Sequence, residues 1–268
     1  MNLFIEGVPG AGKSTLLDRL ARALPSYDAY REGDLSPAEL AWCSRMDRAA
    51  WEALLRRYPA SAADIRRWTV VEDGAYITAY TRVPGAGADF YAEMESYEIY
   101  NGRMPLADFK ALVLRRYRAL GPGGRLFECS FFQNSIDNFL LFFQLPEEEI
   151  LRFYRQASAA VADLFVFYLN SDDLEGDLLR VRRERVDAQG NEQWYAGMLR
   201  YLASSPYGAA HGADGWEDLL AYFRRRRALE LRILRELLPS RSCVLPAKAY
   251  GSAVEVLAAC NLPQTVPR

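Results

Sequence analysis

The stretch with the clearest chemistry in this chain lies at its beginning. Residues 7–14, GVPGAGKS, match the pattern G-x-x-x-x-G-K-[ST]; they follow an apolar run at residues 2–6 and precede a helix-forming run at residues 15–24. Glycines let a backbone bend so that successive N–H groups converge on an anion, and the N-terminus of the following helix adds partial positive charge. Strand, loop and helix together predict a phosphate-binding loop, or P-loop, for a nucleoside triphosphate.

The residue types in this loop assign a role to most positions. Lys13 is expected to reach the β- and γ-phosphates, and the Ser14 hydroxyl is expected to hold Mg²⁺. We therefore predict ATP and Mg²⁺ as cofactors, although GTP stays open as the nucleotide. The residues expected to contact the nucleotide are Gly7, Pro9, Gly10, Ala11, Gly12, Lys13, Ser14 and Thr15.

Three carboxylates follow short β-forming runs and are candidates for the chemistry of phosphoryl transfer. Glu128, near the end of the run at residues 125–130, is a candidate Mg²⁺ ligand through a water molecule, or an organiser of the substrate pocket. Glu32 ends an earlier run and Asp34 follows it, where a carboxylate could accept the proton of an acceptor hydroxyl. We expect Glu32 to be this base and Asp34 to be the second choice. The structural alternative is that both cap a helix starting at Ser36.

An arginine-rich helix is predicted over residues 172–185. Residues three or four apart share a helix face, so the inward pair is expected to be either Arg182 with Arg185 or Arg180 with Arg183. We assign catalytic roles to the first pair and nucleotide contacts to the second. The alternative is that these arginines form a solvated basic face.

These residues need a scaffold, and the order of apolar runs along the chain predicts one. Short β-forming runs are separated by helix-forming segments and lie near residues 2–6, 27–32, 125–130, 164–169 and 242–245. Strands that alternate with helices indicate an α/β fold with a parallel five-stranded sheet and helices on both faces. Residues 1–268 are interpreted as a single domain.

Residues 36–120 contain no strand of this sheet and are interpreted as an insertion beside it, on the acceptor side. The sequence SPAE at residues 36–39 matches a helix N-terminus, so a helix is predicted from there to about residue 57. Asp73-Gly74 between two β-rich runs predicts a hairpin. Some aromatic residues of the insertion are expected in the core and others around an acceptor pocket: Trp42, Trp51, Trp68, Tyr97 and Tyr100.

Composition and charge restrict the partners. The formal net charge of −2 gives no global attraction to nucleic acid or to an anionic membrane, so neither partner is expected. The four cysteines are widely spaced, which predicts reduced thiols, and with no leader before the first strand we expect a cytoplasmic protein. His211, the only histidine, is interpreted as a structural loop residue, and the basic run at residues 224–227 as a solvated face.

Four groups of residues resemble landmarks of one kinase branch. They are Ile5-Glu6-Gly7 with residues 11–15, Arg31-Glu32-Gly33, Glu128-Cys129-Ser130, and residues 162–169 followed by the arginines at 180–185. With them the chain resembles the P-loop kinases of the deoxynucleoside kinase and thymidylate kinase branch. The resemblance implies the strand order 2-3-1-4-5, a lid that carries the arginines, and transfer of the γ-phosphate of ATP to a small-molecule acceptor.

Two departures from the pattern of that branch lie on the acceptor side. Cys129 stands where the branch has an arginine, and Gly33 stands where it has a proline. The acceptor therefore stays open between a nucleoside or nucleotide and another hydroxylated metabolite such as an antibiotic. The alternative class is a P-loop ATPase that acts as a regulator without a small acceptor. That class predicts a hydrophobic strand ending in Asp-Glu, which the sequence lacks. The oligomeric state stays open, with a homodimer as one option.

Overall fold

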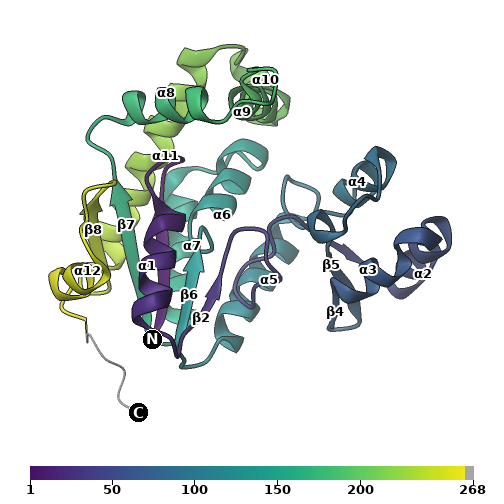
Figure 1. Ribbon diagram of the computed structural model, residues 1–268, viewed down its shortest axis with the longest axis horizontal. Coiled ribbons are helices and arrows are strands. Elements are labelled where there is room, and N and C mark those ends of the chain that lie inside the picture. The colour runs from purple at the N-terminus through teal and green to yellow at the C-terminus, as the bar shows by residue number, and fades with distance from the viewer. Residues whose placement is uncertain (263–268) are drawn as a thin grey trace.

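The structure is a computed structural model that describes residues 1–262. Its centre is a sheet of five parallel strands (Figure 1). In spatial order they are β2 (Asp28–Tyr30), β6 (Arg125–Glu128), β1 (Asn2–Gly7), β7 (Leu164–Asn170) and β8 (Ser242–Pro246). The inner strands β1 and β7 are almost wholly buried, as expected for parallel strands covered on both faces. The predicted α/β fold with a five-stranded parallel sheet is confirmed.

Helices cover both faces of this sheet (Figure 1). On one face α1 (Lys13–Ala23) packs beside α12 (Ala253–Ala259), and on the other α7 (Glu147–Ala160) lies between α5 (Leu106–Ala119) and α11 (Trp216–Leu237). The apolar stripes of α1 and α7 supply the contacts, through residues such as Leu16, Leu20 and Tyr154.

The remaining helices lie at the carboxyl ends of the strands. After β6 come α6 (Gln133–Asp137) and the π-helix η3 (Asn138–Phe142). After β7 come α8 (Leu174–Glu184), α9 (Gln193–Ser204) and α10 (Pro206–His211), which form a lobe above the sheet in Figure 1. Ligands of open α/β sheets bind at this edge, so these helices are placed to surround a site.

The insertion at residues 36–120 builds a second, antiparallel sheet in the order β3 (Cys43–Met46), β5 (Ala75–Ala79) and β4 (Thr69–Glu72). Around it lie α2 (Arg48–Arg57), α3 (Ala62–Arg67), α4 (Ala88–Glu95) and the short 3-10 turns η1 (Pro59–Ser61) and η2 (Tyr80–Arg82). Its helices and sheet share a separate small core, with Leu54, Ile65 and Phe90 buried together.

The predicted hairpin at Asp73-Gly74 is confirmed. β4 and β5 pair antiparallel on either side of it, and the two turn residues have φ angles of 50° and 73°. Positive φ at both central residues is the requirement of the type I′ turn, which Asp-Gly satisfies at little cost.

The helix predicted from Ser36 to about residue 57 is wrong in its first half. The Ser36 hydroxyl accepts hydrogen bonds from the amides of Ala38 (3.1 Å) and Glu39 (3.4 Å), but the chain then turns away. Residues Cys43–Met46 pair with β5, and α2 begins only after Asp47, whose carboxylate caps it by accepting from the Ala50 amide at 2.8 Å. A strand partner some thirty residues away in the chain outweighs the local helix signal.

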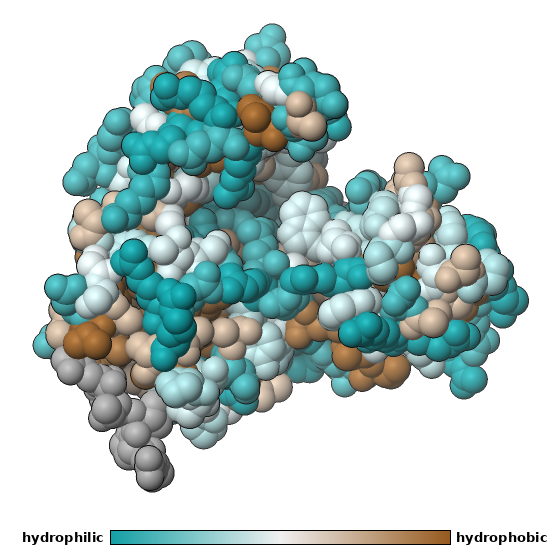
Figure 2. Space-filling model, in the orientation of Figure 1, coloured by the Kyte–Doolittle hydropathy of each residue, from teal (hydrophilic) through white to brown (hydrophobic). Residues whose placement is uncertain are grey.

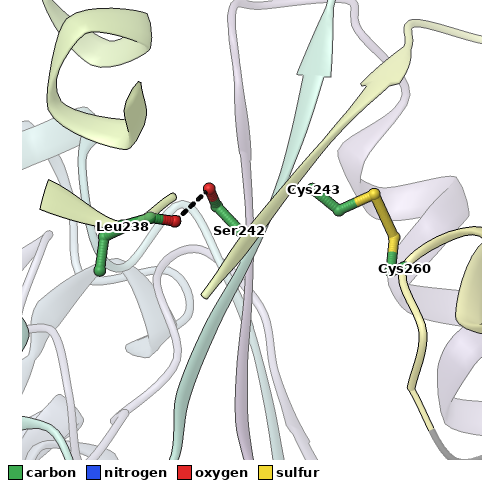
Figure 3. The surroundings of a disulfide bond; sticks show 4 residues. All are labelled: Leu238, Ser242, Cys243 and Cys260. Atoms are coloured by element: carbon green, nitrogen blue, oxygen red, sulfur yellow. Dashed lines mark hydrogen bonds between the residues drawn. A yellow bond between two sulfur atoms is a disulfide. The ribbon is translucent and has the colours of Figure 1, made fainter. Parts of the chain in front are cut away.

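A disulfide joins Cys243 of β8 to Cys260 after α12, with the two Cα atoms 5.7 Å apart (Figure 3). The prediction of four reduced cysteines is therefore wrong for this pair, while Cys43 and Cys129 are buried free thiols. The two partners are 17 residues apart in the chain, and only the packing of α12 beside β8 brings them together. The cytoplasmic location rested partly on reduced thiols and stays a prediction. Within residues 1–262, no helix combines the length and apolarity needed to cross a membrane.

Removing the disulfide is expected to lower the stability of the folded protein by a measurable amount. Cys260→Ser is expected to lower the free energy of unfolding by about 3 kcal/mol, because the unfolded chain gains the entropy of an open loop. Urea unfolding of both proteins, with and without a reductant, measures this. The reductant should destabilise the natural protein and leave Cys260→Ser unchanged; equal stability of the natural protein in both conditions would contradict a structural bond.

Candidate active site

The loop predicted to bind phosphate, called the P-loop below, occupies the turn between β1 and α1. Gly10 and Gly12 have φ angles of 79° and 97°, a left-handed backbone that glycine adopts without strain. Within residues 1–262, the amides of Gly10, Gly12 and Lys13 have no hydrogen-bond acceptor. These amides and the N-terminus of α1 form a cradle that fits the phosphate groups of a nucleotide.

Lys13 and Ser14 begin α1 at the edge of this cradle. The Lys13 ammonium is buried and donates to the carbonyl oxygens of Gly7 and Val8 at 2.9 and 3.0 Å. The Ser14 hydroxyl donates to the Glu128 carboxylate. Because β6 pairs with β1, Glu128 ends its strand opposite Ile5 and reaches the start of α1. The structure thus brings together the two residues predicted to hold Mg²⁺.

A cleft of about 1590 Å³ opens from the P-loop. It appears in Figure 2 as the hollow between the lobe of α8, α9 and α10 and the insertion. One end is lined by Pro9, Gly10, Gly12, Lys13, Ser14 and Thr15 of the P-loop, while Gly7 and Ala11 lie buried behind them. Small-molecule pockets usually enclose roughly 300–1,000 Å³, so this cleft has room for a nucleotide and a second molecule.

Glu32 and Asp34, the two candidate bases, have different surroundings. Glu32 lines the cleft and accepts a hydrogen bond of 2.7 Å from the side-chain amide of Gln133. Asp34 pairs with Arg82 and accepts from the Arg31 amide at 2.7 Å, outside the residues that line the cleft. No helix begins at Ser36, so the capping alternative is wrong for both acids. Geometry favours Glu32 as the residue that faces a ligand.

The four arginines of α8 diverge. Arg185, at the end of the helix, lines the cleft. Arg182 instead bonds Glu192 at 2.7 Å and lies 4.0 Å above the ring of Tyr195. Arg180 pairs with Asp177, and Arg183 is exposed and donates to its own helix. Neither expected pair lies inward as a unit. Arg182, the expected partner of Arg185, is held by Glu192 and Tyr195 at the start of α9.

Arg226 is a cleft residue that the sequence interpretation missed. It is only 1% exposed and lines the cleft, although residues 224–227 were expected to form a solvated face. Its guanidinium bonds Glu230 at 2.7 Å and both oxygens of Asp137 at 3.1 Å. Burial lowers the pKa of Arg226, but the two carboxylates raise it by more, so the group stays charged. The missed signal is periodicity: position 226 lies on the apolar face of α11 that carries Tyr222 and Leu229.

One wall of the cleft comes from α9, which sequence interpretation did not connect with a site. Trp194, Met198 and Tyr201 line the cleft and recur at the spacing of one helix face. Of the aromatic residues considered in the insertion, Trp42 and Tyr100 line it too. The others lie elsewhere: Trp51 and Trp68 at the core of the insertion, and Tyr97 on the surface. The loop predicted around His211 is wrong, because Pro206–His211 form α10. His211 is exposed at the end of this helix and its ring hydrogen-bonds the Tyr207 carbonyl at 2.8 Å.

The C-terminal segment supports the P-loop from the other side. The Tyr250 hydroxyl donates to the carbonyl oxygen of Gly12 at 2.9 Å, and Lys248 bonds Asp177 of α8 at 2.9 Å. Tyr250 and Lys248 also line the cleft. The loop after β8 therefore links the P-loop to α8, and the Cys243–Cys260 disulfide closes this loop.

Glu6 lies directly beneath the P-loop and is fully buried. One of its oxygens accepts from the Phe131 amide at 2.7 Å, and the other has no partner among residues 1–262. Burial raises the pKa of Glu6 to about 8. The carboxyl group is therefore neutral at pH 7, which avoids an unpaired charge in the core.

Sequence comparison with models of known protein families gives no match, and comparison with characterised proteins gives none. The site must therefore be interpreted from its own geometry. Residues 1–262 contain no cluster of three or more His, Cys, Asp or Glu side chains that could hold a metal ion. Mg²⁺ at a P-loop takes most of its ligands from phosphate and water, so a hydroxyl beside a carboxylate is a sufficient protein contribution.

Glu6 makes stability depend on pH in a defined direction. The folded protein keeps this proton to about pH 8, whereas the ordinary pKa is 4.5, so stability falls as pH rises between these values. Glu6→Gln mimics the neutral acid, so it avoids the loss of stability that ionisation of Glu6 causes. Above pH 8 its free energy of unfolding should exceed that of the natural protein by at most about 5 kcal/mol. Urea unfolding of both proteins from pH 5 to pH 8.5 measures the difference.

Glu184→Gln is the matched control, because Glu184 is exposed and forms no hydrogen bond or ion pair within residues 1–262. Its effect should be small and nearly independent of pH. A stability difference between Glu6→Gln and the natural protein that stays constant from pH 5 to pH 8.5 would show that Glu6 ionises normally.

Proposed function

We propose that the protein is an ATP-dependent kinase that transfers the γ-phosphate of ATP to a hydroxyl or phosphate group of a small molecule. The observation that carries this proposal is one continuous cleft that joins the P-loop to Glu32. A nucleotide on the P-loop and an acceptor beside Glu32 would share this cleft. A regulator that only hydrolyses ATP needs no such second compartment, so the cleft favours the kinase.

The topology supports the same class. Counted along the chain, the five strands of the main sheet stand in the order 2-3-1-4-5, as the resemblance to P-loop kinases implies. The P-loop follows the central strand, and Glu128 is the last residue of the neighbouring strand. Such an arrangement gathers the charged ends of several strands at one edge.

Each part of the site has a role in transfer. The amides of Gly10, Gly12 and Lys13, which are free within residues 1–262, and the Lys13 ammonium bind the β- and γ-phosphates and neutralise their charge. Ser14 and Glu128 would hold Mg²⁺, which would supply further positive charge for phosphoryl transfer. Arg185 at the rim reaches the cleft from α8, the expected lid.

On the acceptor side, Glu32 accepts the proton of the attacking hydroxyl. The hydrogen bond from Gln133 leaves the other Glu32 oxygen available and orients the carboxylate. Trp194, Met198 and Tyr201 of α9 form a wall that excludes water and so limits hydrolysis of ATP.

The function is tested by ATP consumption in the presence of nucleosides, nucleotides, sugars or aminoglycosides. One acceptor class is expected to stimulate consumption, and Lys13→Ala should lower that rate by about 10³-fold or more, because charge on the γ-phosphoryl group is left unmatched. Lys110→Ala, which changes a lysine of α5 outside the cleft, is the control. Lys13→Ala activity within tenfold of the natural protein would refute the P-loop mechanism.

Glu32→Gln keeps the size and the Gln133 contact of the side chain but removes its basicity. It should slow phosphorylation of the acceptor by roughly 10²–10⁴-fold and leave nucleotide affinity unchanged. Single-turnover transfer and titration with an ATP analogue measure the two effects separately. Asp34→Asn should retain transfer, since Asp34 bonds Arg82 instead of facing the cleft. Loss of transfer only in Asp34→Asn would reverse the two roles.

A further inference from the structure

The floor of the cleft contains an arginine with one unused donor. Arg226 is gripped by Glu230 through Nε and by Asp137 through Nη1, while its Nη2 is buried without a hydrogen-bond partner in residues 1–262. A buried donor without an acceptor costs free energy, so its retention in a cavity wall points to a ligand atom that accepts from it. This atom must be an oxygen or nitrogen acceptor.

A second donor without a partner in residues 1–262 lies about one helical turn before Asp137, which binds Arg226. The Nδ2 group of Asn134 is buried and has no partner among the described residues, and Asn134 lines the same cleft. Asn134 and Asp137 are three residues apart on α6, so they share a helix face. Because Asp137 binds Arg226, the two free donors lie in the same part of the cleft.

The charge around Arg226 distinguishes between kinds of acceptor. One guanidinium is bonded to two buried carboxylates, Asp137 and Glu230, so the cluster has no positive charge to spare. The hydroxyls of Tyr222 and Tyr168, which donate to these carboxylates, are neutral. A phosphate group placed there would lose its hydration without gaining a net attraction. An uncharged oxygen, such as a carbonyl, only needs the two hydrogen bonds.

Aromatic rings line the cleft beside this cluster. Phe223 follows Tyr222 on α11 and stacks with Trp194 of α9 at a ring-centroid distance of 6.3 Å, and both line the cleft. Phe142 and Tyr201, also in the wall, have centroids 5.5 Å apart. The rim arginines Arg103 and Arg185 are exposed, where water screens their charge. Planar apolar compounds fit such a wall.

We infer that Arg226 and Asn134 form a specificity subsite for a carbonyl oxygen of an uncharged, planar acceptor, and that this subsite disfavours a phosphate-bearing acceptor. The inference rests on the proposed function and narrows its acceptor class. Arg226 is a binding and specificity residue here, with Asp137 and Glu230 as the groups that position it.

Binding is tested with 2-pyridone, a planar uncharged ring with one carbonyl, and with phenyl phosphate, a ring with a dianionic group. The P-loop is first saturated with Mg²⁺ and the β,γ-imido analogue of ATP. NMR titration of the natural protein should show that 2-pyridone shifts the signals of the Asn134 amide and the Arg226 Nε–H, and that it binds at least about tenfold more tightly than phenyl phosphate.

Arg226→Lys keeps one positive charge beside Asp137 and Glu230 but removes the Nη2 donor, and it should weaken 2-pyridone binding about tenfold. Asn134→Ala removes the second donor without breaking any hydrogen bond within residues 1–262, and it should weaken binding about fivefold. Arg225→Lys, the same change at the preceding position of α11 but outside the cleft, should leave binding unchanged. Thermal unfolding confirms that each variant is folded. If Arg226→Lys does not fold, the binding measured for Asn134→Ala decides the test.

The subsite is refuted if 2-pyridone does not bind, if it binds the folded variants as tightly as the natural protein, or if phenyl phosphate binds more tightly. The titration needs no phosphoryl transfer, so it separates the two proposals. Donor-dependent 2-pyridone binding together with no transfer to any acceptor would leave the subsite standing and reject the kinase. Phosphoryl transfer to an acceptor, together with 2-pyridone binding that does not depend on the two donors, would support the kinase and reject the subsite.

Discussion

The pairing of β1 with strands on both sides is the constraint on which the site depends. On one side Ile5 is in register with Glu128 of β6, and on the other Gly7 is in register with Leu169 of β7. The first pairing places the Glu128 carboxylate against Ser14. The second leaves so little space that a Cβ atom at Gly7 would lie 2.6 Å from the Leu169 carbonyl oxygen. The P-loop thus begins at a point fixed from both sides by main-chain hydrogen bonds.

A buried polar network continues from this sheet into the far part of the cleft. Arg226 of α11 joins Asp137 of α6 to Glu230, and Glu230 in turn accepts from Tyr168 of β7 at 2.7 Å. Burying such charges costs free energy that their attraction does not fully return, so the network is better explained by the geometry that it imposes. It holds α11 against α6 and so sets the shape of the floor beneath α9.

The insertion has its own small sheet and core, so it presents a preformed wall to the cleft. Glu98, which accepts from Tyr80 and Asn101, lines the cleft, and Tyr201 of α9 donates to Asn101 at 2.8 Å. This chain of hydrogen bonds crosses from the insertion to the helices after β7. Burial raises the pKa of Glu98, and the donors from Tyr80 and Asn101 oppose that rise. The two walls of the cleft are therefore coupled through polar side chains as well as through the sheet.

The sequence by itself determined the features that are encoded locally. Glycine spacing identified the loop between β1 and α1, apolar runs identified the five parallel strands, and Asp73-Gly74 identified a hairpin, because backbone conformation and hydrophobic period are properties of neighbouring residues. Tertiary structure alone decided which distant residues meet. It turned Cys43–Met46 into a strand, joined Cys243 to Cys260, and tied Asp34 to Arg82 while Glu32 stayed at the cleft. It also buried Arg226 in the cleft wall, because the packing of α11 on α6 adds Asp137 to Glu230 of the same helix, and a buried guanidinium needs such paired carboxylates.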